Sequence, residues 1–238
     1  MKAMILAAGL GTRLKPFTDK HPKALAQVNG KTLLQRNIEY LLQYGIRDII
    51  VNVHHFADQI IQHLSENENF NCNITLSDER NEVLETGGGL KKASWFFDDS
   101  QPFLLMNVDI LTLLHLDEMI ATHRQGQPLA TLAVSDRNSS RCFLFDQAGI
   151  LCGWKNKNSA EEKISRTADT LFEKSFSGIH IIDPHIFSLM HQEGKFSIVD
   201  TYLEIAKSNI IKAFDHSGVL LMDVGKPESI VEAEKFFL

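Results

Sequence analysis

Glycine and basic residues with spacing suited to phosphate binding crowd the start of the sequence. Gly9 and Gly11 follow a short apolar run, and Arg13 and Lys23 come shortly after them. Glycines let backbone N–H groups approach phosphate oxygens closely, because no Cβ intervenes. Arginine offers a planar fork that suits a polyphosphate, and lysine offers a compact point charge. These residues predict a site for a small phosphorylated anion.

This basic cluster stands out against an acidic chain. The formal net charge is −6, yet among the first 31 residues the only acidic side chain is Asp19. The basic side chains there are Lys2, Arg13, Lys15, Lys20, Lys23 and Lys31. For Lys2 and Lys31 we expect solvated surface positions. For Arg13 and Lys23, the neighbouring glycines favour a role in binding.

Two common phosphate-binding motifs do not fit this segment. The dinucleotide fingerprint requires a third glycine where Leu14 stands. The stretch NGKT, residues 29–32, resembles the end of a P-loop, but the leading glycine of that motif would fall at Leu25. The sequence therefore disfavours both a Rossmann dehydrogenase and a P-loop nucleotide hydrolase.

Two aspartates each end an apolar stretch. Asp109 follows PFLLMNV and Asp223 follows VLLM. An aspartate in such a place can simply cap the next turn, and we keep that alternative for either residue alone. Polyphosphate chemistry, however, needs a hard cation held by oxygen ligands, normally Mg²⁺ on one or two carboxylates. Two such aspartates weaken that alternative and make both residues candidates for holding such a cation.

The segment LAAGLGTRLKPFTDKHPKAL, residues 6–25, resembles the signature of the sugar-1-phosphate nucleotidyltransferases. The usual form is L-x-x-G-x-G-T-R-L-x-P-L-T followed by P-K-P-L; here Phe17 replaces a leucine and Ala24 replaces the second proline. The resemblance implies catalytic roles for Arg13, Lys23 and Asp109. It also implies a nucleotide-binding loop made of Leu6, Ala7, Ala8, Gly9, Gly11, Thr12 and Arg13.

Two later segments extend the resemblance. LETGGGL, residues 84–90, is similar to the family's second nucleotide loop, which implies that Glu85, Gly87 and Gly88 bind nucleotide. Glu85 stands where glycine is common, a pattern typical of N-acetylmuramate-1-phosphate uridylyltransferases. Without the resemblance, residues 87–89 predict a tight turn into a helix. NVD and LMDVGKPES resemble the family's metal-binding segments, which implies that Asp109 and Asp223 bind Mg²⁺.

The segments expected to bind the sugar carry a weaker resemblance to the family. FSGIHIID, residues 176–183, is similar to the segment that lines the sugar pocket, and sugar contacts are expected at Asn107, Lys157, Gly178 and Ile179. The family's Glu-Lys-Pro motif has no clear counterpart. Glu173 and Lys174 lie too near Gly178, whereas Asn156 and Lys157 have better spacing but lack the glutamate.

The resemblance implies that the chain transfers a nucleoside monophosphate from a nucleoside triphosphate to a sugar 1-phosphate, releasing pyrophosphate. UTP with N-acetylmuramate 1-phosphate and GTP with mannose or heptose 1-phosphate both remain open. Three alternatives also remain. One is a choline-phosphate cytidylyltransferase, although the FSGI and DVG segments fit the sugar enzymes better. The others are a regulatory nucleotide-binding module without activity and a phosphate-binding structural domain.

The elements that would position these residues alternate between strand and helix. Strands joined through helices run parallel with both faces covered. We therefore expect an α/β fold with a doubly wound, mixed but mainly parallel Rossmann-like sheet and a small antiparallel addition after residue 129. Strands are expected near 2–8, 47–53, 73–76 and 102–108, and helices near 32–44, 56–64, 88–97, 184–190, 198–208 and from 227. The polar stretch 155–170 suggests a mobile loop.

Composition sets the outer limits. The 238 residues, 44% hydrophobic and 23% charged, suit one globular domain over 1–238. No apolar run approaches about 18 residues and no signal peptide is recognisable, so we expect a cytoplasmic protein, monomeric or a small homo-oligomer. The negative charge disfavours nucleic acid and membrane partners. Cys72, Cys142 and Cys152 have no disulfide or zinc-site spacing and are expected to be buried.

Overall fold

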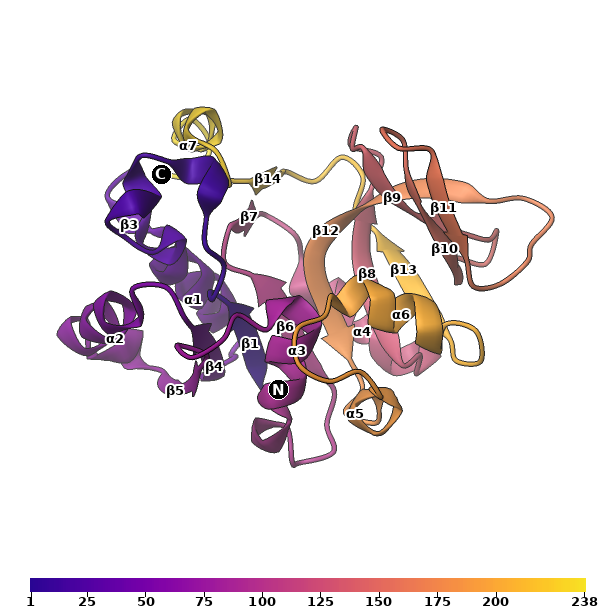
Figure 1. The fold of residues 1–238 in the computed structure, drawn as a ribbon, viewed down its shortest axis with the longest axis horizontal. Coiled ribbons are helices and arrows are strands. Elements are labelled where there is room, and N and C mark those ends of the chain that lie inside the picture. The colour runs from indigo at the N-terminus through magenta and orange to yellow at the C-terminus, as the bar shows by residue number, and fades with distance from the viewer.

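The computed structural model describes all 238 residues and is organised around a ten-stranded mixed sheet (Figure 1). Four parallel strands form its first half in the order β6-β1-β4-β5. They are β1 (Ala3–Leu6), β4 (Asp48–Val53), β5 (Asn73–Asp78) and β6 (Phe103–Asn107). In β1 all four side chains are buried, because the strand lies between two helical layers. The expected parallel core is confirmed.

Helices cover both faces of this sheet. Ala3 and Ile5 of β1 point into one hydrophobic core, and Met4 and Leu6 point into the other, as strand alternation requires. The first core is completed by α1 (Leu33–Gln43), α2 (Ala57–Glu66), α4 (Leu116–Gly126) and α7 (Pro227–Ala233). The second is completed by α3 (Glu85–Lys92), α5 (Ile186–Leu189) and α6 (Ile198–Ile205). In Figure 1, α3 and α6 lie in front of the strands.

The long strand β12 (Phe172–Ile182) joins the parallel half to the antiparallel half. It pairs antiparallel with β6, with β8 (Ala130–Ser135) and with β9 (Arg141–Phe145). Its register against β8 shifts between Phe176 and His180, where Gly178 has a φ of +72°. Glycine fits this backbone because it tolerates the left-handed region. β13 (Ile211–Asp215) pairs parallel with β8.

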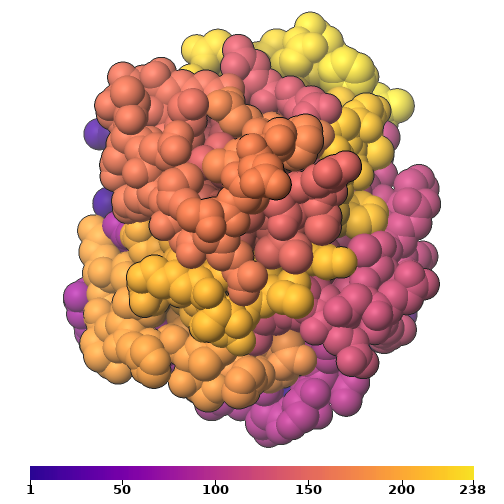
Figure 2. Space-filling model, turned by 90° about the vertical axis from the view of Figure 1, so that its right-hand side faces the viewer, coloured from indigo at the N-terminus to yellow at the C-terminus, as the bar shows by residue number.

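Most of the stretch expected to be a mobile loop is instead a β-hairpin. β10 (Leu151–Asn156) and β11 (Glu161–Ile164) pair antiparallel at the edge of the sheet. The prediction was wrong because β11 is exposed along its whole length, so no alternation of apolar residues marks it as a strand. In Figure 2, which faces this end of the molecule, the atoms of this hairpin region lie above those of α6.

Two other local expectations also differ from the structure. Residues 87–89 lie inside α3, which begins at Glu85, so they form helix rather than a tight turn. Helix α4 has no counterpart among the expected elements, although Leu116, Met119 and His123 mark its buried face at helical spacing.

Shorter elements complete the chain. β7 (Ile110–Thr112) pairs with β14 (Leu221–Asp223), and β2 (Gln27–Val28) pairs with β3 (Lys31–Thr32). Short 3₁₀ turns occupy Thr12–Leu14, Phe17–Asp19, Lys23–Leu25, Glu68–Asn71 and Ser94–Phe96. The three cysteines are free and buried, as expected. None of the helices has the length and apolar character that crossing a bilayer would demand.

Candidate functional site

A cavity of about 490 Å³ opens at the carboxyl ends of β1 and β6, where ligands bind in parallel α/β sheets. It is lined by residues from the glycine loop, from the start of α3 and from the end of β6. Among the residues predicted from the sequence, the lining includes Leu6, Ala7, Ala8, Gly9, Gly11, Thr12, Lys23, Glu85, Asn107 and Asp109. The topology therefore brings most of the residues predicted to bind nucleotide together around one cavity.

Gly11 shapes the loop that carries the basic residues. Its φ is +62°, and a Cβ at this position would lie 2.8 Å from Thr18 Cγ2 and 2.9 Å from Lys23 Cβ. The Thr18 hydroxyl donates a hydrogen bond to the Gly11 carbonyl oxygen at 2.9 Å. Glycine is thus required both by the backbone conformation and by the close approach of the segment that brings Lys23 into the cavity.

Opposite charges meet at one end of the cavity. Lys23 Nζ forms an ion pair with Asp109 Oδ2, and both side chains are largely buried. Arg13 Nη2 lies 4.0 Å from Asp109 Oδ2 and 3.7 Å from Asp223 Oδ1. The Arg13 side chain is 55% exposed, so its guanidinium keeps a face toward solvent. One guanidinium therefore stands between the two predicted metal-binding carboxylates.

Strand pairing explains how Asp223 reaches this place. β14 lies antiparallel to β7, which pairs Asp223 with Ile110, the residue after Asp109. Gly225 follows two residues later, and a Cβ there would lie 2.7 Å from both Arg13 Nη2 and Asp223 Oδ1. Gly225 thus leaves the space that the guanidinium fills, a function that no spacing pattern in the sequence indicated.

The carboxylates fit a hard divalent cation. Asp223 Oδ1 is buried and has no hydrogen-bond partner, so one strong acceptor is left for a ligand. No group of three or more His, Cys, Asp or Glu side chains is placed to hold a metal. Two carboxylates without nitrogen or sulfur ligands are the donors that hard divalent cations take in proteins, with further ligands from phosphates and water.

The second predicted loop faces the cavity only at its beginning. Glu85 has a φ of +60°, a left-handed conformation that glycine adopts more readily than glutamate. Its carboxylate lies 3.5 Å from Lys195 Nζ, and both residues line the cavity. Gly87 and Gly88 lie outside the lining, because their backbones pack against Phe196 and Gly194.

Sequence reasoning missed two buried polar residues beside the cavity. The Asn52 side-chain oxygen accepts hydrogen bonds from the backbone N–H groups of Ala7 at 2.6 Å and Ala8 at 3.3 Å. Its amide nitrogen donates to Glu79 Oε1 at 2.8 Å. Burial raises the pKa of Glu79, partly offset by the hydrogen bond from Asn52. The only sequence signal was one asparagine inside the apolar stretch DIIVNV.

The predicted sugar-side residues do not gather at one point. A Cβ at Gly178 would lie 2.8 Å from Asn107 Nδ2, so these two residues are neighbours. The Ile179 side chain is fully buried in the core and is not available to a ligand. Lys157 lies in the antiparallel half, where its Nζ pairs with Glu173 Oε2 at 2.7 Å.

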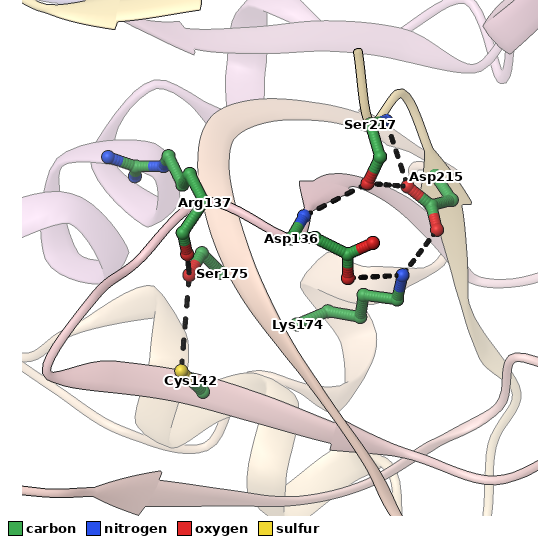
Figure 3. A network of polar contacts seen from close by, with 7 residues as sticks. All are labelled: Asp136, Arg137, Cys142, Lys174, Ser175, Asp215 and Ser217. Carbon is green, nitrogen blue, oxygen red and sulfur yellow. Dashed lines mark hydrogen bonds and ion pairs between the residues drawn. The ribbon is translucent and has the colours of Figure 1, made fainter.

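Lys174 is likewise engaged in structure. Its Nζ contacts Asp136 Oδ1 at 2.7 Å and Asp215 Oδ2 at 2.5 Å, and the Ser217 hydroxyl donates to Asp215 Oδ1 at 2.6 Å (Figure 3). This network ties β12 to β13 and to the turn after β8. Both members of the Glu173–Lys174 pair are thus engaged in ion pairs within the protein.

A larger hollow of about 720 Å³ lies between β11 and α6. Its lysines are already paired, Lys163 with Asp200 at 3.1 Å and Lys207 with Glu204 at 2.5 Å. None of the predicted site residues lines it. Size alone is thus a poor guide here, and the chemistry points to the smaller cavity.

Comparison with known proteins agrees with this geometry. The family model described as nucleotidyl transferase matches residues 2–238. The N-acetylmuramate alpha-1-phosphate uridylyltransferase of Caulobacter vibrioides is 31% identical, with 98% of this chain and 95% of that protein covered. The mannose-1-phosphate guanyltransferase of Yarrowia lipolytica is 26% identical over 100% of this chain, which spans 64% of that protein. The crystal structure of HddC from Yersinia pseudotuberculosis matches with a TM-score of 0.80 and 26% identity, covering 100% of this chain and 99% of that one.

Proposed function

The chain belongs to the nucleotidyl transferase family, and on that premise we propose that it transfers a nucleoside monophosphate from a nucleoside triphosphate to a sugar 1-phosphate. The products are a nucleoside diphosphate sugar and pyrophosphate. The observation that carries the proposal is the position of Arg13 Nη2, within 4.0 Å of both Asp109 and Asp223 beside the 490 Å³ cavity.

The reaction needs charge control more than acid–base chemistry. A phosphate oxygen of the sugar 1-phosphate attacks the α-phosphorus of the nucleotide, and the bond to pyrophosphate breaks. Because the nucleophile is already an anion, no general base is required. The barrier is dominated by repulsion between two anions, so in-line positioning and charge neutralisation supply the catalysis.

The side chains of this chain match those tasks. Arg13 stabilises the charge on the departing pyrophosphate, and Lys23 draws the reacting phosphates together. The glycine loop, residues 9–12, binds the triphosphate through its backbone N–H groups. Asp109 and Asp223 would hold Mg²⁺. When bound, this ion supplies Lewis-acid stabilisation of charge on the phosphoryl oxygens.

Among donor and acceptor pairs, we propose UTP with N-acetylmuramate 1-phosphate. The Caulobacter relative supports this choice, because the match covers 95% of its length, against 64% for the Yarrowia relative. Glu85 in LETGGG supports it further. GTP with mannose 1-phosphate or a heptose 1-phosphate is the second candidate, which the Yarrowia relative supports. Neither relative is a choline-phosphate cytidylyltransferase, so that alternative gains no support.

The remaining expectations belong to this proposal. We take residues 1–238 as one catalytic domain that acts in the cytoplasm as a monomer or small homo-oligomer. Its partners would be the two small-molecule substrates, with no nucleic acid and no membrane. Its product would serve cell-envelope polysaccharide synthesis.

The decisive experiment crosses four nucleoside triphosphates with a panel of sugar 1-phosphates. Pyrophosphate release is followed with Mg²⁺ present, and each product is identified by mass. We expect one pair to exceed all others, and release to depend on both substrates. The Asp109→Asn variant serves as the background control. A folded protein that releases no pyrophosphate from any pair would contradict the proposed function.

A further inference from the structure

Glu79 is a buried carboxylate that forms no ion pair, although the charge of Lys92 acts on it at longer range. It follows β5 directly and is 1% exposed. The neighbouring Arg80 pairs with Asp78 and Asp58 rather than with Glu79. Burying an ionisable group without an ion pair is costly unless hydrogen bonds compensate. The hydrogen bonds that Glu79 accepts should therefore reveal what it does.

Those hydrogen bonds lead to both loops of the cavity. Asn52 donates to Glu79 Oε1 at 2.8 Å, and the backbone N–H of Leu84 points to Glu79 Oε2 at 3.4 Å. Asn52 in turn accepts from the backbone N–H groups of Ala7 and Ala8. One continuous chain of hydrogen bonds thus runs from residues 6–12, the first loop, to residues 84–90, the second loop.

Packing makes the same connection. A Cβ on Gly89 would lie 2.8 Å from Glu79 Oε1 and 2.9 Å from Asn52 Nδ2, so the backbone of α3 rests directly on this pair. Asn52 is itself 2% exposed, although it touches the cavity. Glu79 does not line the cavity, so any effect it has on a ligand there must pass through the loops.

We propose that Glu79 is a positioning residue that acts through Asn52 to set the first and second loops relative to each other. The inference rests on the proposed function, because it assumes that the nucleoside triphosphate binds between these loops. Its consequence is specific. Disturbing Glu79 should weaken the binding of the nucleoside triphosphate and leave the binding of the sugar 1-phosphate largely unaffected.

Exchanging the carboxylate of Glu79 and the amide of Asn52, while keeping the length of each side chain, gives a sharp test. In Glu79→Gln, the new amide faces the Leu84 N–H, donor against donor. In Asn52→Asp, a carboxylate oxygen faces Glu79 Oε1, acceptor against acceptor. The double variant Asn52→Asp/Glu79→Gln restores a donor–acceptor pair in the reverse direction and keeps acceptors for Ala7, Ala8 and Leu84. Glu82→Gln, at an exposed position in the same segment, is the matched control.

We expect each single variant to raise the KM for the nucleoside triphosphate by about tenfold, as the loss of one hydrogen bond to a charged group implies. The KM for the sugar phosphate should stay within about twofold. The double variant should recover most of the nucleotide affinity. A Glu79→Gln enzyme that behaves like Glu82→Gln, or a double variant with the summed defect of the two single variants, would overturn the inference.

Amide hydrogen exchange separates this inference from the proposed function, because it needs no activity. We expect residues 6–12 and 84–90 to exchange faster in both single variants, and to return toward the wild-type rate in the double variant. Exchange in residues 27–43 should not change in any variant. If neither loop changes, or if only one does, the coupling is refuted even in an active enzyme. If both loops respond but no substrate pair reacts, only the proposed function fails.

Discussion

The backbone N–H of Val224 donates a hydrogen bond to the carbonyl oxygen of Asp109 at 2.8 Å. This contact fixes the chain directly after Asp223 against the residue that carries the other carboxylate. The spacing of the two acidic groups is therefore set by backbone pairing between β7 and β14 and not by flexible side chains. A site built in this way can hold its charges in place before any ligand arrives.

The first prediction concerns the guanidinium between the aspartates. Arg13→Ala should lower turnover by on the order of 10²-fold, because one preorganised electrostatic donor typically contributes that much. The side chain is 55% exposed, so the midpoint of thermal unfolding should hardly move. Lys15→Ala is the control, since Lys15 pairs with Asp19 at 3.0 Å on the surface. Equal rates in the two variants would remove Arg13 from the mechanism.

The second prediction concerns the metal. Asp109→Asn should give a folded protein that has lost its Mg²⁺-dependent turnover, because a neutral amide is a much weaker ligand for a hard cation. Chelation of divalent ions should stop the wild-type enzyme, and added Mg²⁺ should restore it. Steady-state pyrophosphate release over a range of Mg²⁺ concentrations checks both statements. Full activity of Asp109→Asn at ordinary Mg²⁺ would show that this carboxylate is not a ligand.

The third prediction tests the space beside Arg13. Gly225→Ala would place a methyl group 2.7 Å from Arg13 Nη2 and from Asp223 Oδ1, so one of the two must move. We expect turnover to fall at least tenfold, since small displacements of catalytic groups have large effects on rate. Gly126→Ala is the control, because its nearest neighbour would be Pro128 Cδ at 3.6 Å. Wild-type activity in Gly225→Ala would mean that the guanidinium does not need its present position.

The fourth prediction concerns acid stability. Burial lowers the pKa of His180 to about 3, and its Nδ1 lies 2.7 Å from the Tyr202 hydroxyl. Below pH about 6.5 the unfolded chain takes up a proton at this histidine that the folded protein does not. As the pH is lowered from about 6.5 to about 3, the free energy of unfolding should therefore decrease. For this group the decrease is about 1.4 kcal/mol per pH unit.

Urea unfolding at several pH values measures this slope. His180→Asn should flatten it by that amount, whereas His191→Asn, at an exposed position, should leave it unchanged. Buried His123 and His216, whose pKa values are also lowered by burial, should account for part of the slope that remains. An identical slope in His180→Asn and in the wild type would contradict the assignment.

The parts of the fold that the sequence predicted well are those with a strong apolar pattern, either a continuous apolar run or apolar residues at helical spacing. The runs at Ala3–Leu6 and Phe103–Asn107 are buried strands because every side chain in them is apolar or nearly so. Helix α1 was predictable from its apolar face, and Thr32 caps it by accepting from the Gln35 N–H. The hairpin containing Glu161–Ile164 was not predictable, because an exposed edge strand has no apolar pattern.

The site divides in the same way. The convergence of the glycine loop and Asp109 was predictable, because residues that follow neighbouring parallel strands meet at one edge of the sheet. Asn52, Glu79 and Gly225 were not, since the role of each depends on contacts with residues distant in sequence. Lys157 shows the converse. Its spacing in the sequence suggested a place in the sugar pocket, whereas in the structure it forms an ion pair with Glu173 in the antiparallel half of the sheet.

The three consecutive glycines of α3 have a consequence for the order of folding. Each weakens an isolated helix by about 1 kcal/mol relative to alanine, so residues 85–92 should be a random coil on their own. The helix forms in the native protein because the Phe196 ring and the Gly194 backbone pack directly against these glycines, which have no side chains to prevent that contact. We therefore expect α3 to be absent from the folding nucleus and to join the native state late, after partners more than a hundred residues away have arrived.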